Sequence, residues 1–200
     1  GTGHVEMYRS GHIWIGVSAQ KVGIDGREGG LAPLYLKAVN PDRYGELLHP
    51  GDSFSYDIFT QVAGLLRGPE AAELLGDREA DYLLALGESQ SASRLVTYIN
   101  AVHPLYNPYD GYIVHSRGGG SAPLAQEPLA GIPAPSAPII RDDINVPVMT
   151  FQTETDVTEL GFSEARQPDE GNVLLWEVAG TSHADYYTIV AGRLDSDGAA

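Results

Sequence analysis

The sequence contains no cysteine, and this absence limits its chemistry before any motif is considered. Without a thiol the chain can form no disulfide bond, no thiolate metal site and no cysteine nucleophile. Any covalent catalysis must therefore start from a serine, threonine, lysine or carboxylate side chain.

Basic residues are also scarce. The chain has 12 Lys and Arg against 27 Asp and Glu, which gives a formal net charge of −15. Such a charge repels phosphate backbones and anionic lipid headgroups, and no local cluster of basic residues offsets it. We therefore expect no nucleic-acid partner and interpret the charge mainly as a contribution to solubility.

Long apolar runs are missing as well. No run approaches the roughly 18 to 20 residues that a membrane-spanning helix needs, so we expect no integral membrane segment. The 200 residues, 42% hydrophobic and 20% charged, instead fit one globular domain that is large enough to bury a core.

Short β-rich apolar runs are present and alternate with helical patterns. The runs cover residues 13–17, 82–86, 112–114, 146–151 and 173–178. Strands that alternate with helices are typical of a parallel α/β sheet. The sequence therefore predicts an α/β fold with a mostly parallel sheet flanked by helices.

Two of the intervening segments have the apolar spacing of amphipathic helices. The first covers residues 54–66 and is ended by Gly68-Pro69, and the second covers 92–102 and is ended by His103-Pro104. Residues 117–145 are rich in Gly, Ala and Pro, which excludes a regular helix. We predict an irregular, cap-like excursion there.

The pentapeptide Gly87-Glu88-Ser89-Gln90-Ser91 lies where a predicted strand meets a predicted helix. A nucleophilic serine needs this context, because its hydroxyl must be exposed on a sharp turn beside backbone amides. Gly87 is the small residue that the turn requires, while Ser91 stands where a second glycine is usual. Taken alone, the pentapeptide is equally compatible with a Gly-Ser turn that caps an ordinary helix.

Two further strand ends carry residues that could activate this serine. The run 146–151 leads to Glu154 and Asp156, and the run 173–178 leads to His183. The order serine, acid, histidine is that of the α/β-hydrolases. Either acid could orient the histidine, and the spacing favours Asp156.

The chain resembles the α/β-hydrolase superfamily, and more narrowly the bacterial α/β-hydrolase-domain proteins with a Gly-Glu-Ser-Gln-Ser nucleophile elbow. Besides the elbow, the supporting segments are residues 17–20, 43–45, 49–52, 176–180 and 183–185. If residues 13–17 are the fourth of the usual eight strands, the first three precede Gly1. We thus expect residues 1–200 to form one catalytic domain that lacks the first strands of the fold.

The resemblance implies a serine esterase with a Ser-His-acid triad. Ser89 would be the nucleophile, His183 the general base and Asp156 or Glu154 the acid, and the amide of Gln90 would bind the oxyanion. The substrate would be a small-molecule ester, and we expect no metal and no cofactor. Two alternatives remain open: an acyltransferase with the same triad, and a catalytically silent hydrolase-like fragment or binding scaffold.

Overall fold

The computed structural model describes residues 4–27, 35–76 and 78–190. The chain forms two compact units, one of residues Tyr56–His183 and the other of Gly1–Ser55 with Ala184–Ala200. The first unit contains all four described strands and every residue singled out above for catalysis.

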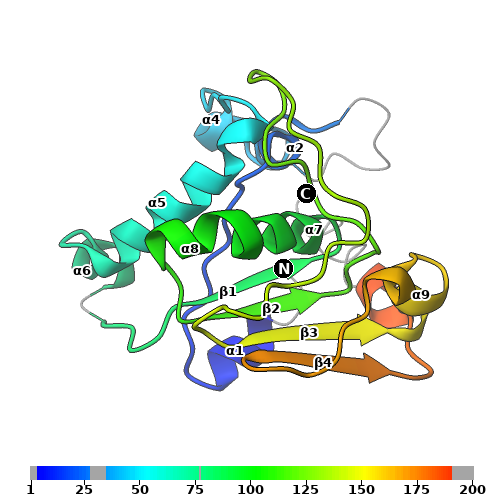
Figure 1. Cartoon of the computed structure of the whole chain (residues 1–200). Coiled ribbons are helices and arrows are strands. Elements are labelled where there is room, and N and C mark those ends of the chain that lie inside the picture. Colours follow the sequence, from blue (N-terminus) through cyan, green and yellow to red (C-terminus); the bar gives the residue numbers. More distant parts are fainter. Residues whose placement is uncertain (1–3, 28–34, 77, 191–200) are drawn as a thin grey trace. The chain divides into compact units, whose positions relative to one another are not determined.

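The sheet of this unit is parallel throughout. Its strands are β1 (Leu84–Glu88), β2 (Gly111–His115), β3 (Val148–Thr153) and β4 (Val173–Val178), and they lie side by side in chain order (Figure 1). The predicted parallel α/β fold is confirmed. Because all strands run the same way, their carboxyl ends meet at one edge of the sheet.

Helices cover one face of this sheet. Figure 1 shows α5, α7 and α8 on the same side of the strands. The helical elements of the unit are α5 (Ser55–Arg67), α6 (Ala71–Leu75), α7 (Gln90–Thr97), the π-helix η2 (Tyr98–Val102), α8 (His103–Tyr106), α9 (Glu154–Thr158) and the 3-10 helix η3 (Phe162–Ala165).

The core between helices and sheet contains a group of packed aromatic rings. Tyr98 contacts Phe59, Tyr109 and Tyr112 at ring-centre distances of 5.4, 6.0 and 6.3 Å. The hydroxyls are satisfied: Tyr109 donates to the Phe59 carbonyl, and Tyr98 pairs with the Thr60 hydroxyl. Burial raises the pKa of Tyr98 to about 12, so its hydroxyl stays neutral near pH 7.

The prediction that the helix after β1 ends at His103-Pro104 is wrong. The helix continues to Tyr106. The His103 amide donates to the Tyr98 carbonyl, five residues earlier, and α8 begins at this point. Pro104 therefore lies in the first turn of α8, where proline is tolerated. Pro104 has no N–H for the Asn100 carbonyl, and Nη1 of Arg141 donates to that carbonyl instead, at 3.0 Å. An external donor thus replaces the missing helix bond.

Three strand predictions need correction, and one of them, at 146–151, is observed two residues later as β3 (Val148–Thr153). Residues 13–17 form no strand, because no described segment makes a backbone ladder with them, and an apolar run is a strand only when it is paired. The strand predicted at 82–86 lies two residues later, since the Leu83 amide bonds to the Asp110 carboxylate outside the ladder.

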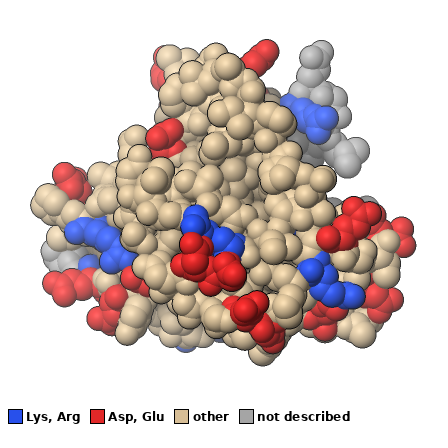
Figure 2. All heavy atoms as spheres, in the orientation of Figure 1, with Lys and Arg blue, Asp and Glu red and all other residues tan. Residues whose placement is uncertain are grey.

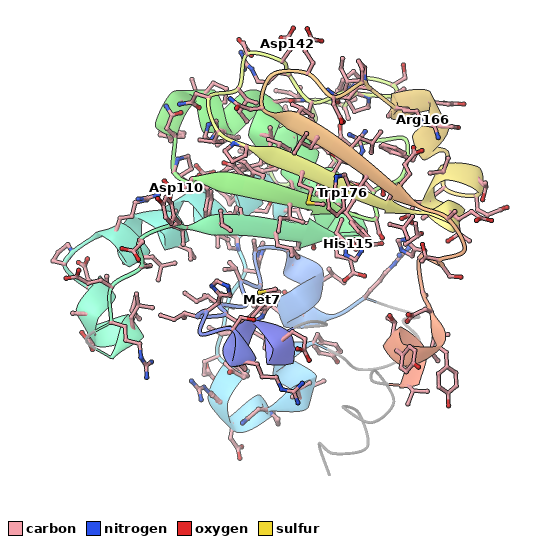
Figure 3. All side chains as sticks on the ribbon, turned by 90° about the horizontal axis from the view of Figure 1, so that it is seen from below. Met7, Asp110, His115, Asp142, Arg166 and Trp176 are labelled. Carbon is pink, nitrogen blue, oxygen red and sulfur yellow. The ribbon has the colours of Figure 1, made fainter. Side chains whose placement is uncertain are left out.

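The second face of the sheet carries mostly apolar side chains that are exposed or partly exposed, with Leu84, Leu86, Leu174 and Trp176 among the exposed ones. Glu88, His115, Phe151 and Trp176 are register partners across the four strands, and His115 packs edge-on against Phe151. Figure 3 views this face, with His115 and Trp176 labelled on it. His115 therefore lies on the surface of the sheet, where its ring packs against Phe151.

The excursion over residues 117–145 is irregular, apart from one antiparallel bridge between Ala125 and Ile132. Arg117 is buried near its start, and its Nη2 donates to the Pro138 carbonyl at 2.6 Å. Burial lowers the pKa of Arg117 to about 10, which leaves it charged at neutral pH. The guanidinium thus fastens the far end of the excursion to the end of β2.

The described part of the other unit contains short helices joined by irregular segments. They include α1 (His4–Arg9), α2 (Lys21–Asp25), α3 (Leu36–Val39), α4 (Pro41–Tyr44) and the 3-10 helix η1 (Asp52–Phe54), and residues 186–190 are also helical. His49 bridges two of its segments, because Nε2 donates to the Ala19 carbonyl and Nδ1 accepts from the Gly51 amide. This histidine has a structural role.

The described surface agrees with the acidic composition. On the face shown in Figure 2, acidic side chains form several small groups and basic side chains lie singly among them. Among the described residues, no helix has the length and apolar character needed to cross a membrane.

Gly119 offers a test of the packing beside the excursion. A Cβ at this position would lie 2.5 Å from the Gly161 carbonyl oxygen, whereas one at the neighbouring Gly120 would meet nothing within 4 Å. We predict that Gly119→Ala lowers the free energy of unfolding by about 1 to 3 kcal/mol. Gly120→Ala is the matched control and should leave it nearly unchanged in urea unfolding curves. Equal effects would show that this contact is not needed.

Candidate active site

The turn between β1 and α7 presents Ser89 at the carboxyl edge of the sheet. Its backbone has φ 54° and ψ −114°, a conformation that L-residues other than glycine rarely adopt. The Ser89 amide donates to the His115 carbonyl at 3.0 Å, which fixes the turn to the end of β2. Ser89 is thus a partly exposed residue in a strained backbone conformation, on a sharp turn between a strand and a helix.

Gly87 permits this turn because strand and helix approach each other closely there. A Cβ on Gly87 would lie 2.7 Å from the Ser91 carbonyl oxygen and 3.1 Å from the Ala92 amide nitrogen. Position 91 is different, since the Ser91 side chain faces outward and is exposed. The structure thus explains why glycine is needed at 87 and why serine is accepted at 91.

The junction between β3 and α9 holds Asp156. Thr153 is the N-cap residue of α9 and Asp156 the third residue of the helix, and the two form a capping box. One carboxylate oxygen of Asp156 accepts from the Thr153 amide at 2.7 Å. The local helix start therefore fixes the orientation of this buried carboxylate.

The loop after β4 brings His183 between the other two residues. Its Nδ1 lies 2.6 Å from Oδ1 of Asp156, and its Nε2 lies 3.0 Å from Oγ of Ser89. The tautomer that satisfies both contacts carries hydrogen on Nδ1, which donates to the carboxylate, while Nε2 accepts from the hydroxyl. The three side chains form one continuous chain of hydrogen bonds.

Burial differs strongly along this chain. The Asp156 side chain is fully buried, whereas 28% of the His183 side chain is exposed. Burial alone raises the pKa of the Asp156 carboxyl, but the bonds from the Thr153 amide and the His183 ring outweigh it, so the pKa lies below its usual value. Asp156 is therefore a carboxylate at neutral pH.

The other acid, Glu154, does not touch the imidazole. Its Oε2 accepts from the Gly180 amide at 2.7 Å, three residues before the histidine. Between the two acids, Oγ1 of Thr155 accepts from the His183 amide at 2.6 Å. Gln90 is the first residue of α7, so its amide belongs to the turn whose N–H groups have no acceptor within the helix.

The structure thus brings Ser89, His183 and Asp156 together, and it places Glu154 in α9, where it bonds to the loop that precedes His183. Sequence reasoning missed Thr153 and Thr155. A signal for Thr153 was present, because Thr153-x-x-Asp156 has the spacing of a capping box. Among the described residues, no three His, Asp or Glu side chains gather as metal ligands would.

The family described as "Alpha/beta hydrolase domain" matches residues 1–200, the whole chain. No curated protein and no solved structure matches the chain.

Gly87 provides a test of the turn. We predict that Gly87→Ala forces β1 and α7 apart, lowers the free energy of unfolding by about 1 to 3 kcal/mol and displaces Ser89. Gly64→Ala, on an open surface of α5, should instead stabilise the protein by up to about 1 kcal/mol. Urea unfolding measures both changes, and a neutral Gly87→Ala would contradict the close approach.

Proposed function

We propose that this chain, which belongs to the alpha/beta hydrolase domain family, is a serine hydrolase that cleaves small-molecule carboxylic esters. Family membership supports a hydrolase-type function. The observation that carries the finer proposal is the hydrogen-bond chain from Asp156 through His183 to Ser89, with contacts of 2.6 and 3.0 Å.

In the first half of the reaction, Ser89 forms an acyl-enzyme. Its Oγ attacks the ester carbonyl while Nε2 of His183 takes the hydroxyl proton. The tetrahedral intermediate then collapses, and the imidazolium gives this proton to the departing alkoxide. Asp156 keeps the ring in the required tautomer and stabilises its positive charge.

In the second half, water replaces the alcohol. His183 takes a proton from the water, the resulting oxygen nucleophile attacks the acyl carbon, and the proton returns to Ser89 as the acid leaves. In both halves negative charge develops on the former carbonyl oxygen. The Gln90 amide, at the N-terminus of α7, is the donor that we assign to this oxyanion.

The first test removes the nucleophile. Ser89→Ala should abolish enzymatic turnover of p-nitrophenyl acetate and labelling by a fluorophosphonate, because the hydroxyl that would carry the acyl or phosphonyl group is removed. The folded state should be retained, because this side chain contributes little packing. His183→Ala should cost a similar factor, because triad residues act as a unit.

A matched control is His115→Ala, which removes a histidine of the sheet surface and should keep the wild-type rate. Undiminished turnover in Ser89→Ala would remove Ser89 from the mechanism. A wild-type chain that neither turns over esters nor reacts with the fluorophosphonate would be a silent scaffold.

The second test compares the two acids. Asp156→Asn should lower kcat by up to about 10⁴-fold, because an amide favours the wrong imidazole tautomer. Glu154→Gln should be milder by at least about tenfold, since the glutamine oxygen can still accept from the Gly180 amide. The reverse ranking of kcat values would transfer the acid role to Glu154.

A further inference from the structure

We propose that Glu154 and Thr155 are positioning residues that hold the histidine loop, residues 179–183, in register with Ser89. The proposal rests on the function proposed above. It extends the site from three residues to five and gives the acid that does not contact the imidazole a defined task.

Three consecutive residues of α9 bind this loop. Glu154 accepts from the Gly180 amide at 2.7 Å, Thr155 accepts from the His183 amide at 2.6 Å, and Asp156 accepts from the His183 ring at 2.6 Å. The side chains of Glu154 and Thr155 therefore fix the loop backbone, while Asp156 fixes the ring. Backbone and imidazole of the same histidine are held by neighbouring residues of one helical turn.

The loop has few other attachments. Thr181 Oγ1 donates to the Val178 carbonyl at the end of β4, which shapes the loop but does not tie it to another element. In the part of the chain that the structure describes, the remaining hydrogen bonds of residues 179–183 go to α9 and to Ser89. The position of His183 relative to Ser89 thus depends on α9.

The turn that holds the loop is itself fixed to the sheet. The capping box between Thr153 and Asp156 joins the end of β3 to the first turn of α9. The loop follows β4, and α9, which binds the loop, follows β3. Because β3 and β4 pair over six residues, both start from the same part of the sheet. Loss of the Glu154 contact would free the loop backbone and leave both hydrogen bonds of the Asp156 carboxylate in place. The Thr155 hydroxyl also lies 3.4 Å from the Thr153 hydroxyl, so Thr155 contacts the cap of α9 as well as the loop.

These two residues act through His183. Neither contacts the Ser89 hydroxyl, and neither exchanges a proton with the imidazole. Their loss should thus lower the fraction of molecules with a well-placed ring, which reduces kcat and leaves KM unchanged. A displacement of about 1 Å can cost up to about a hundredfold in rate, and we expect decreases between about tenfold and a hundredfold.

The experiment compares threonines on the same helix. Thr155→Val keeps the shape of the side chain and removes the acceptor, and Thr155→Ser restores the acceptor. Thr158→Val is the matched control, because the Thr158 hydroxyl donates to the Glu154 carbonyl within α9. With p-nitrophenyl acetate as substrate, kcat should be lower in Thr155→Val than in the wild type. The kcat values of Thr155→Ser and Thr158→Val should stay close to the wild-type value.

The glutamate is tested in the same way. Glu154→Leu removes the acceptor for the Gly180 amide, Glu154→Gln keeps one, and Glu159→Leu makes the same change at an exposed glutamate just after α9. Glu154→Leu should lower kcat more than Glu154→Gln, and Glu159→Leu should have no effect. Equal kcat values for the two leucine variants would overturn the role of Glu154.

Coupling to His183 distinguishes positioning from general destabilisation. In a His183→Ala background, Thr155→Val should cause no further loss of the residual rate, because the group it positions is gone. If Thr155→Val lowered the rate of His183→Ala by the same factor as it lowers the wild-type rate, the proposal would be overturned. A kcat for Thr155→Val no lower than that for Thr158→Val would also overturn it.

A readout that needs no turnover separates this proposal from the esterase proposal. The ring N–H signal of His183 in the proton NMR spectrum reports its bond to Asp156. It should weaken and exchange faster with water in Thr155→Val but persist in Thr158→Val. This result would support positioning even if the wild-type chain failed to hydrolyse esters. An unchanged signal and exchange rate in Thr155→Val would refute positioning.

Discussion

The candidate site depends on one buried carboxylate that is shared between a helix start and a histidine. Asp156 is fully buried, and burying a charge is costly unless hydrogen bonds compensate it. One oxygen accepts from the Thr153 amide and the other from the His183 ring. These bonds keep the carboxylate ionised, join the ends of β3 and β4, and orient the imidazole toward Ser89.

The parallel sheet supplies the remaining geometry. Its strands are in register, so the residues that follow β1, β3 and β4 reach the same edge although they are far apart in the chain. Ser89 occupies a strained conformation at this edge, and the close approach of Gly87 to α7 leaves no room for the turn to relax. The packed sheet and helices hold the serine where the histidine can reach it.

Much of this arrangement could be predicted from the sequence. Apolar runs located all four observed strands to within two residues, and the polar residues after three of these runs predicted the order serine, acid, histidine. The strand predicted at residues 13–17 was wrong because an apolar run does not reveal whether a partner strand exists. The predicted helix end at Pro104 was wrong because Arg141, 41 residues from Asn100, donates to the Asn100 carbonyl in place of the missing proline N–H. No local sequence pattern contains this contact.

The choice between the acids shows where local and tertiary information meet. Residues 154 and 156 occupy the first and third positions of α9, and the third position of a capping box points back toward the N-cap. Asp156 is therefore directed inward by the helix start itself, whereas Glu154 stays exposed and reaches outward to the loop. The helix start thus orients the carboxylate through contacts that are local in the sequence. What folding must add is the docking of residues 179–183 on the same turn, and that docking sets the distance from His183 to Ser89.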